Sequence, residues 1–302
     1  MREPPRTLTL VGLGYSGRAI AARAAAGGWR VRATARDPAA LTPPPGVELV
    51  EFAAPGWAEA ATHLVVTAPP GEAGDPVWAA HAARLAAAPL RWVGYLSTTG
   101  VYGDRGGGWV EEDTPPAPGQ PRSLRRRAAE RQWEALAARA AVDLFRTGGI
   151  YGPGRSALEE ARAGTARRIL KPGHAFGRIH VEDIARAVLA AAARPPAPGL
   201  RVLHLVDDAP AEPAQVAEEA CRLLGLPPPP AIPFAEAWAR MSEMARSFWA
   251  ENRRVANART KAALGLDWAY PSYREGLRAI LALQAGEQRA EGAAEQGELR
   301  GG

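Results

Sequence analysis

The sequence lacks several features that mark whole classes of protein. Its single cysteine, Cys221, excludes a disulfide framework and cysteine-based metal sites, and this usage fits a reducing cytoplasm. No run of eighteen or more apolar residues occurs, and the first residues lead into an apolar β-like run rather than a signal peptide. We therefore expect a soluble cytoplasmic protein with no membrane span, no targeting segment and no metal.

Lysine is almost absent, because Lys171 and Lys261 are the only two in a chain of 302 residues. Arginine supplies nearly every cation, and the formal net charge is +5. The arginines are spread over every expected helix, no aromatic residues alternate with them, and 32 acidic residues accompany them. This distribution favours a solvated basic surface over a nucleic-acid-binding one.

The stretch TLTLVGLGYSGRAIAARAAAGG, residues 7–28, is the most informative part of the chain. An apolar strand breaks into a glycine turn, spelled G-x-G-x-x-G, and continues as an alanine-rich helix. In this context the first glycine permits a tight turn, the second lets the backbone approach a pyrophosphate, and the third lets the helix pack closely on its strand. The helix N-terminus would attract the phosphates. The residues of this loop that we expect to contact a dinucleotide are Gly12, Gly14, Tyr15, Ser16 and Gly17.

The next expected strand, residues 29–37, bears on the choice between NAD and NADP. An acid at the end of this strand usually meets the ribose and favours NAD, but here that position falls on Ala35 and Arg36 follows it. An arginine can bind a 2′-phosphate with two hydrogen bonds, so we favour NADP. Asp37 keeps NAD open, because a shift of one residue would place it on the ribose. Its alternative role is that of an N-cap or turn residue before Pro38.

Further apolar runs alternate with helical patterns, which predicts a doubly wound α/β fold with a mostly parallel sheet. The expected strands are 46–52, 62–70, 91–104, 141–154 and 200–210, and the expected helices include 75–89 and 213–226. His81 lies on the apolar stripe of the first helix, where a packed histidine is more typical than a ligand. Because strand ends line the cofactor crevice of such sheets, we also expect contacts from Thr67, Ala68 and Pro69.

Four later segments carry a family resemblance. They are LSTTGVYGD (96–104), WVEEDTPPAP (109–118), RTGGIYGPGRSALE (146–159) and RIHVEDIARAV (178–188). In this order they resemble the signatures of the extended short-chain dehydrogenase/reductase superfamily, in the NAD-dependent epimerase/dehydratase group. The closing NRRVANARTKAALGLDWAYPSYREGLRAIL resembles the atypical YeeZ-like branch of that group. The resemblance covers about residues 7–284.

The resemblance implies a Rossmann-type domain and a smaller C-terminal substrate-side region. We expect the Rossmann domain over 1–148, with its sheet rejoined by about 200–206, and the substrate side over 149–286. The composition of 287–302 predicts a disordered tail. Substrate-side residues that we expect near the site are Gly149 for the cofactor and Lys171, Arg178 and His180 for the substrate pocket.

In this family a Ser or Thr four residues before the Tyr of V-Y-G hydrogen-bonds the substrate oxygen. Because Tyr102 is that tyrosine here, the equivalent residue is Thr98. The simpler alternative for Thr98 is a strand-end hydroxyl that satisfies backbone groups. The family also carries Y-x-x-x-K on a helix, in which the tyrosine transfers a proton and the lysine lowers its pKa and holds the nicotinamide ribose.

The chain departs from the family at this dyad, because the corresponding segment, residues 120–140, contains no tyrosine. If Glu130 fixes the register, Arg126 takes the lysine position and Arg122 the tyrosine position. A shift of one residue would place Arg127 and Ser123 there instead. An arginine can hold a ribose hydroxyl or a carboxylate, but its pKa is too high for it to transfer protons near neutral pH. The alternative for these arginines is a solvated helix face.

Three explanations of the missing tyrosine remain open. The proton could come from Tyr102, Tyr151 or His180, the substrate could need no strong acid, or the protein could bind a dinucleotide without turning it over. We therefore expect an NAD(P)-dependent oxidoreductase or epimerase-like enzyme acting on a small molecule. The alternative is a catalytically weak dinucleotide-binding sensor or partner protein. An apolar stripe that includes Met241 and Phe248 is expected to serve as core or as the surface of a homodimer.

Overall fold

The computed structural model describes residues 6–300, apart from the side chains of 287, 288 and 290–300. Its centre is a sheet of seven strands, all paired in parallel, in the order β11-β7-β5-β4-β1-β2-β3. The strands are β1 (Thr7–Val11), β2 (Arg30–Ala35), β3 (Val47–Glu51), β4 (His63–Val66), β5 (Trp92–Thr98), β7 (Ala141–Thr147) and β11 (Gly199–Leu205). This topology confirms the predicted doubly wound Rossmann-type fold, including the late strand that rejoins the sheet.

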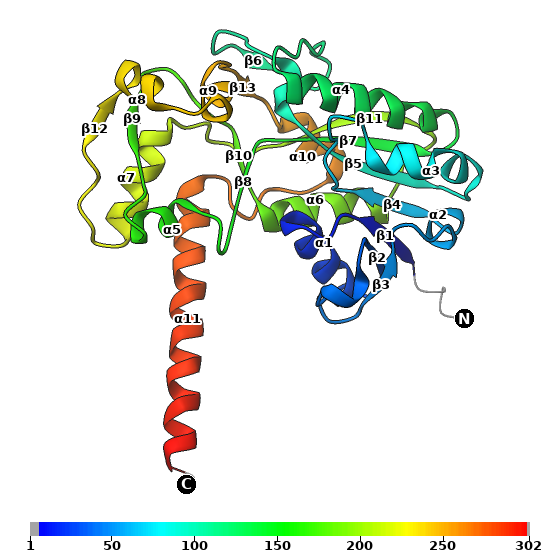
Figure 1. Cartoon of the computed structure of the whole chain (residues 1–302), viewed down its shortest axis with the longest axis horizontal. Helices are drawn as coiled ribbons and strands as arrows, with labels where there is room; N and C mark the ends of the chain where they lie inside the picture. The colour runs from blue at the N-terminus through cyan, green and yellow to red at the C-terminus, as the bar shows by residue number, and fades with distance from the viewer. Residues whose placement is uncertain (1–5, 301–302) are drawn as a thin grey trace.

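Helices cover both faces of the sheet (Figure 1). One face carries α1 (Tyr15–Ala26) and α6 (Val181–Ala193), and the other carries α2 (Gly56–Glu59), α3 (Pro76–Ala87) and α4 (Pro121–Glu134). Alternating strand residues supply the two apolar layers: Leu10 packs with Ile20 on one face, and Val66 packs with Leu85 on the other. Burial of each such side chain contributes about 1.5–3 kcal/mol, so the two layers are the main source of stability.

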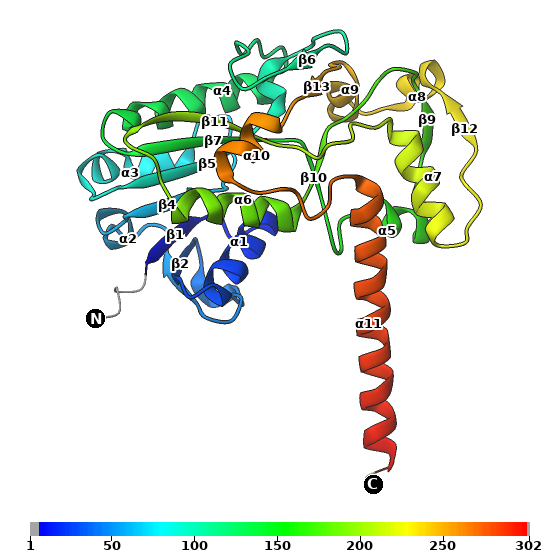
Figure 2. The ribbon, with the colours of Figure 1, turned by 180° about the vertical axis from the view of Figure 1, so that it is seen from behind.

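A second, smaller group of elements lies beside the sheet (Figure 2). It contains the parallel pairs β8 (Gly149–Tyr151) with β10 (Arg178–His180) and β9 (Arg168–Leu170) with β12 (Ala231–Pro233). Its helices are α5 (Ala157–Arg162), α7 (Pro213–Leu223), α8 (Phe234–Arg240) and α9 (Glu243–Trp249). In each pair the two strands are separated along the chain by other elements of this group.

The substrate-side region is interleaved with the Rossmann domain rather than simply following it. Helix α6 lies within the expected substrate side, yet it packs on α1 and on the sheet. The short helix α10 (Ala258–Leu264) also adds Leu264 to the layer beneath the sheet. The strand pair β6 (Trp109–Val110) and β13 (Arg254–Val255) joins the loop after β5 to the segment after α9. Short 3-10 turns complete the chain: η1 (Pro38–Ala40), η2 (Thr99–Tyr102) and η3 (Ala135–Ala138).

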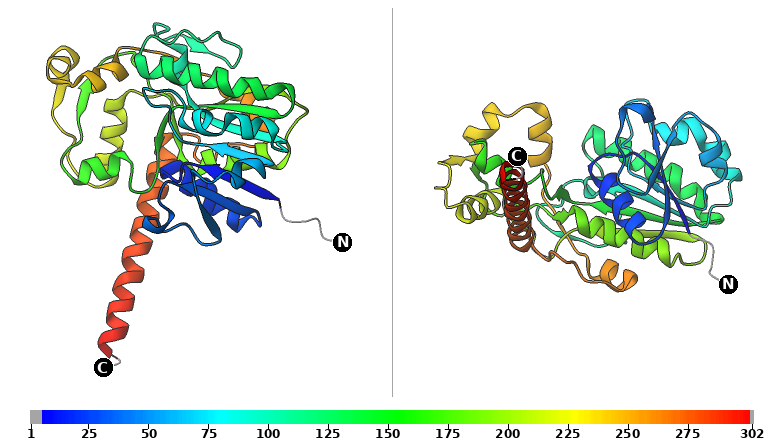
Figure 3. Two further views of the ribbon diagram at one scale, coloured as in Figure 1. Left: turned by 45° about the vertical axis from the view of Figure 1, so that its right-hand side comes forward. Right: turned by 90° about the horizontal axis from the view of Figure 1, so that it is seen from below.

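The last helix, α11 (Tyr273–Arg300), starts inside the second group and then runs away from the body of the molecule (Figure 3). Its first turns pack against α5 and α7 through Tyr273, Leu277 and Ile280. The helix continues through 287–300, where composition predicts a disordered tail. Those residues are mainly Ala, Glu, Gln and Arg, which are strong helix formers. Residues 301 and 302 lie outside the described part of the chain.

The apolar stripe expected in the second half is divided between two short helices, α8 and α9. Met241 and Trp249 are buried, whereas Met244 and Phe248 are exposed. The stripe is therefore partly core, and the homodimer stays a prediction. Within residues 6–300, no helix has the length and apolar character needed to cross a membrane.

The turn between β1 and α1 is fixed by steric contacts at two of its glycines. Gly12 has φ +100°, and a Cβ there would lie 2.8 Å from the backbone nitrogen of Ala68. A Cβ on Gly17 would lie 2.1 Å from the carbonyl oxygen of Gly12, so only glycine lets α1 approach β1 this closely. A Cβ on Gly14 would meet nothing within 4 Å. The fold therefore requires glycine at positions 12 and 17, whereas Gly14 leaves open space beside the turn.

We predict that Gly17→Ala destabilises the protein, although alanine alone would favour a helix by about 1 kcal/mol. The added Cβ collides with backbone, so the free energy of unfolding should fall by at least about 2 kcal/mol. Urea unfolding followed by circular dichroism measures this change. Gly14→Ala is the matched control and should stay within about 1 kcal/mol of the wild type. Equal stability of the two variants would contradict the steric assignment.

Candidate functional site

A small cavity of about 170 Å³ lies at the carboxyl ends of β1, β4 and β5. Its walls include the residues Gly14, Tyr15, Ser16, Gly17 and Thr67. Helix α1 begins here without a side-chain cap, so its first N–H groups remain available to an anion. The open space above Gly14 and the uncapped helix start fit a pyrophosphate. Of the predicted cofactor residues, these five share one cavity.

The three predicted residues that follow β4, namely Thr67, Ala68 and Pro69, have different roles. The Thr67 hydroxyl donates to the carbonyl oxygen of Gly12 at 2.5 Å, so it holds the glycine turn as well as lining the cavity. The backbone nitrogen of Ala68 lies against Gly12, and neither Ala68 nor Pro69 is part of the cavity wall. Thr67 thus lines the space predicted for the dinucleotide, and Ala68 supports the turn behind it.

Arg36 and Asp37 follow β2 and have different surroundings. The carboxylate of Asp37 accepts a hydrogen bond from the backbone nitrogen of Ala39 at 3.1 Å and caps the turn η1. Arg36 is exposed, and its side chain makes no hydrogen bond or ion pair within residues 6–300. The aspartate therefore has the capping role that the sequence left open, and the arginine at the strand end has free donors.

A larger cavity of about 570 Å³ adjoins the first one and lies between the sheet and the second group of elements. The two cavities share the wall residues Ser97, Arg126, Thr147, Ile150 and Arg155. Thr98 and Gly149 also line the larger cavity, as does Arg178. A molecule in the small cavity would therefore reach the larger one directly, which is the arrangement that a cofactor and a substrate need.

The first turns of α4 settle which arginines face this cavity. Arg122 and Arg126 both line it, together with Ser123. Arg127 faces elsewhere and pairs with Glu130 and Glu134. The cavity wall thus contains both arginines of the register fixed by Glu130, one helical turn apart, and that register stays a prediction.

The two arginines are held by different contacts. Arg126 donates to the carbonyl oxygen of Leu96 at 2.6 Å and to the Tyr95 hydroxyl at 3.2 Å, which fixes it at the junction of the two cavities. Arg122 lies with its guanidinium carbon 3.6 Å from the centre of the Phe248 ring and makes no side-chain hydrogen bond within residues 6–300. Arg126 is anchored, whereas all the donors of Arg122 remain available.

A buried polar network lies directly behind the cavity wall. The Ser97 hydroxyl donates to Glu130 at 2.6 Å, and Arg146 donates to the same carboxylate through Nε at 3.0 Å and Nη2 at 2.9 Å. Arg146 also donates to the Tyr102 hydroxyl at 2.7 Å, and that hydroxyl lies 2.5 Å from Nε2 of His204. Glu130 and Arg146 are 0 % and 3 % exposed, so this pair compensates two charges that water does not reach.

The residues considered as alternative proton sources do not line the larger cavity. Tyr102 is fully buried within the network, and burial raises its pKa to about 12. The hydroxyl of Tyr151 donates to the carbonyl oxygen of Ser272 at 3.3 Å, and burial raises its pKa as well. Neither phenol is placed to replace the missing tyrosine of α4.

His180 and Lys171 are likewise engaged away from the cavity. His180 accepts a hydrogen bond from the backbone nitrogen of Glu182 through Nδ1, and burial lowers its pKa to about 4. Lys171 donates to the carbonyl oxygen of Trp249 at 2.7 Å, which ties β9 to the end of α9. Of the three predicted pocket residues, only Arg178 lies in the cavity wall.

Several wall residues were not anticipated from the sequence. They are Ser97, Thr147, Arg155, Phe176, Phe248, Glu251 and Arg253. Arg155 follows the glycines of the G-P-G-R loop, and that position is a signal that could have pointed to it. Arg253 and Glu251 precede β13, and only the pairing of β13 with β6 brings them to the site. The sequence around Arg253 and Glu251 resembles that of any polar loop, so it contains no signal that points to the site.

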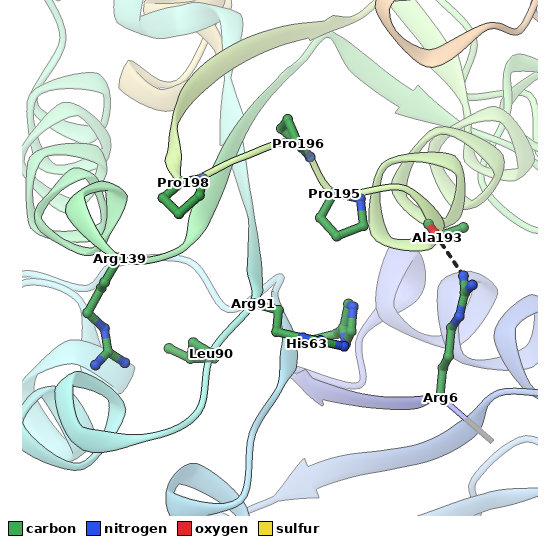
Figure 4. A pocket seen from close by; sticks show the side chains of 9 residues that line it. All are labelled: Arg6, His63, Leu90, Arg91, Arg139, Ala193, Pro195, Pro196 and Pro198. Carbon is green, nitrogen blue, oxygen red and sulfur yellow. Dashed lines mark hydrogen bonds between the residues drawn. The ribbon is translucent and has the colours of Figure 1, made fainter. Parts of the chain in front are cut away.

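A third cavity, of about 520 Å³, lies at the opposite edge of the sheet and also contains arginines (Figure 4). Arg6 donates to the carbonyl oxygen of Ala193 at 2.8 Å, at the end of α6. Arg139 donates to Leu85 and Ala88 at 2.8 and 2.7 Å, at the end of α3. Cations suit the carboxyl ends of helices, so these arginines cap helices.

We predict that Arg146→Met destabilises the protein by about 3–5 kcal/mol, because the buried Glu130 would lose its bidentate partner and keep Arg127 as its one remaining cation among the described residues. The double variant that also carries Glu130→Met should be destabilised by less than the sum of the two single substitutions. Urea unfolding of the four proteins gives the coupling energy. Arg131→Ala is the control, because Arg131 is exposed on the same helix. Additive effects of the two substitutions would contradict the ion pair.

Comparison with known proteins supports the architecture. No family model matches the chain. A conserved protein of unknown function from Silicibacter pomeroyi is 44 % identical, with a TM-score of 0.83 over 92 % of this chain and 98 % of that one. A protein from Methylobacillus flagellatus, classed with the NAD-dependent epimerases/dehydratases, is 25 % identical, with a TM-score of 0.69 over 93 % and 99 %.

A curated relative is known as 3-diazoavenalumate denitrifying reductase from Streptomyces and is 33 % identical over 181 residues. That match takes in 56 % of this chain and 58 % of the relative, so the chain spans little more than half of the relative's length. The human epimerase family protein SDR39U1, whose structure contains NADPH, shares the fold with a TM-score of 0.71 at 20 % identity, over 91 % of this chain and 98 % of that one. The glycine turn, the parallel sheet and these relatives agree, and the chain has the fold of the extended and atypical short-chain dehydrogenases/reductases and is similar to the NAD-dependent epimerase/dehydratase group.

Proposed function

We propose that this protein is an NADP-dependent reductase that acts on a small molecule. The observation that carries the proposal is the pair of adjoining cavities, one built on the glycine turn and the other on α4, which share Ser97, Arg126 and Thr147. The curated relative is named as a reductase, and the human relative was solved with NADPH. Both facts support the same class of chemistry.

The chain has groups that would hold each part of the dinucleotide. The backbone at Gly14 and the first turn of α1 would bind the pyrophosphate. Arg36 would bind the 2′-phosphate, because its guanidinium is free and Asp37 is occupied by its cap. Arg126 would donate to the nicotinamide ribose from the lysine position, since Leu96 already holds one of its nitrogens toward the junction of the cavities.

When bound, the cofactor supplies a hydride. Thr98 would orient the acceptor group of the substrate from the wall of the larger cavity. Its hydroxyl oxygen accepts from the backbone nitrogen of Gly100 at 3.1 Å, which leaves the hydroxyl proton free for donation to the substrate. The Ser97 hydroxyl donates to Glu130 instead, so Thr98 is the better placed of the two.

The arginines of α4 would stabilise negative charge that develops during hydride transfer, without giving up a proton. Such electrostatic stabilisation is strongest in a cavity that excludes water. The proposal therefore favours a substrate whose reduction needs no strong acid from the protein, with any proton taken from solvent water. This accounts for the absence of a phenol on α4 and agrees with the positions of Tyr102 and Tyr151 away from the cavity.

The proposal is tested by measuring binding and turnover separately. NADPH binding is followed by its fluorescence, and NADPH oxidation is then followed at saturating cofactor with a panel of aldehydes, ketones and other hydride acceptors. We expect binding and measurable oxidation with at least one acceptor class. Tight binding without oxidation across the panel would overturn the reductase and favour the sensor alternative. Absence of NADPH and NADH binding would overturn both.

We predict that Arg36→Ala weakens NADPH binding by about 10- to 100-fold and leaves NADH binding within about twofold. A charge-assisted hydrogen bond contributes about 1.5–3 kcal/mol, and only NADPH carries the 2′-phosphate that would form it. Fluorescence titration with both cofactors measures the two constants. Arg30→Ala is the matched control, because Arg30 is exposed at the other end of the same strand. Equal loss for the two cofactors would refute the role of Arg36.

A further inference from the structure

The larger cavity contains an excess of positive charge. Its wall includes one carboxylate, that of Glu251, and five arginines: Arg122, Arg126, Arg155, Arg178 and Arg253. The Glu251 carboxylate pairs with Arg253 at 2.8 Å, which accounts for one of the five charges. The remaining arginines have no acidic partner within 4.0 Å among the described residues. A ligand of opposite charge would complete this wall.

Several donors of these arginines are unused. The guanidinium groups of Arg122 and Arg155 make no hydrogen bond within residues 6–300, although each lies over an aromatic ring. Nε of Arg253 is buried and has no partner. Of the three arginines in the third cavity, Arg6 and Arg139 differ in this respect, because they donate to helix carbonyls (Figure 4).

Desolvation also acts on this cluster. Burial lowers the pKa of Arg122, Arg178 and Arg253 below the ordinary value of an arginine. All three still carry their charge at neutral pH because that ordinary value is so high. Arg122 and Arg178 are thus partly desolvated and have no acidic partner within 4.0 Å among the described residues, which is a feature of binding sites rather than of stable packing.

Part of the remaining wall is apolar and aromatic, and hydroxyl side chains such as Thr98 and Thr147 line the rest. Ile150 and Val255 line the cavity, as do the rings of Phe176 and Phe248. The ring of Phe248 supports Arg122 from one side, with 3.6 Å between the ring centre and the guanidinium carbon, so its donor edge is held in place. This combination suits a molecule with one anionic end and an apolar or aromatic body.

We propose that the larger cavity binds a small carboxylate substrate, with the carboxylate hydrogen-bonded by Arg122 and Arg253 and the apolar body against Phe176 and Phe248. Arg122 thereby has an anion-binding role at the position where the family has its proton-transferring tyrosine. The inference rests on the proposed function only in assigning the neighbouring cavity to the cofactor. Glu251 argues against a doubly charged phosphate, because its carboxylate is only 8 % exposed and would repel the second negative charge.

The test uses the full-length protein, with and without saturating NADP⁺, and isothermal titration calorimetry. The probes are benzoate and cinnamate, their neutral isosteres benzamide and cinnamamide, and phenyl phosphate. We expect each carboxylate to bind at least about tenfold more tightly than its amide, because two charge-assisted hydrogen bonds distinguish them. Phenyl phosphate should bind more weakly than benzoate.

The variant Arg122→Ala should lose most of the preference for carboxylate over amide, with a loss of about 10- to 100-fold for cinnamate and little change for cinnamamide. Arg131→Ala, on the exposed face of the same helix, should behave as wild type. Thermal unfolding and NADP⁺ binding of both variants show whether the fold is intact. Because Arg122 is exposed at the cavity mouth, the variant should fold.

Three outcomes would overturn the inference. They are equal affinity for carboxylates and amides, including no binding of either; an unchanged preference in Arg122→Ala; and tighter binding of phenyl phosphate than of benzoate. Failure of the proposed function is seen separately, as an absence of NADPH and NADH binding. The carboxylate preference of the cofactor-free protein still reports on the cavity in that case.

Discussion

The buried ion pair between Glu130 and Arg146 is the interaction on which the site depends. The two residues come from α4 and β7, and their charges have no access to water. The Glu130 carboxylate is compensated by the bidentate contact from Arg146 and a single contact from Arg127, and Ser97 adds a further hydrogen bond. Because Glu130 lies one turn beyond Arg126 on the same helix face, the pair fixes the rotation of α4 and turns Arg126 toward the cofactor cavity.

This fixed rotation determines which side chains of α4 face the larger cavity in the absence of a tyrosine. A helix free to rotate could present Arg127 or a solvated face, but Arg127 pairs with Glu134 on the other side. The first turns of α4 present guanidinium groups to the cavity, and they present no phenol or ammonium group. Guanidinium keeps its proton at neutral pH, so the site offers charge and hydrogen bonds instead of proton transfer. Under the proposed function, such a site would select substrates by their charge and by how readily they accept a hydride.

Local patterns were sufficient to predict the fold and the glycine turn that lines the small cavity. Gly12, Gly14 and Gly17 sit where their spacing placed them, because that motif is defined by contacts within one strand, one turn and one helix. The far wall of the larger cavity could not be predicted in this way. Arg253 reaches it only because β13 pairs with β6, about 140 residues away along the chain, and such pairing leaves no periodic signal. Tyr102 is the opposite case. Its motif is recognisable in the sequence, but its side chain is buried in the polar network behind the cavity wall.

The many arginines of this chain are distinguished by the acceptors around them, not by their sequence context. Arg139 meets three carbonyl groups at the end of α3, and this contact neutralises the helix end without any ligand. Arg146 meets a carboxylate and becomes part of the core. Arg122 meets only the face of an aromatic ring, which orients the guanidinium but leaves every N–H without an acceptor. An arginine that is positioned yet has no acceptor is suited to a ligand, and four other arginines line the same cavity. The physical criterion that separates structural from binding arginines here is therefore the supply of acceptors, which only the folded chain determines.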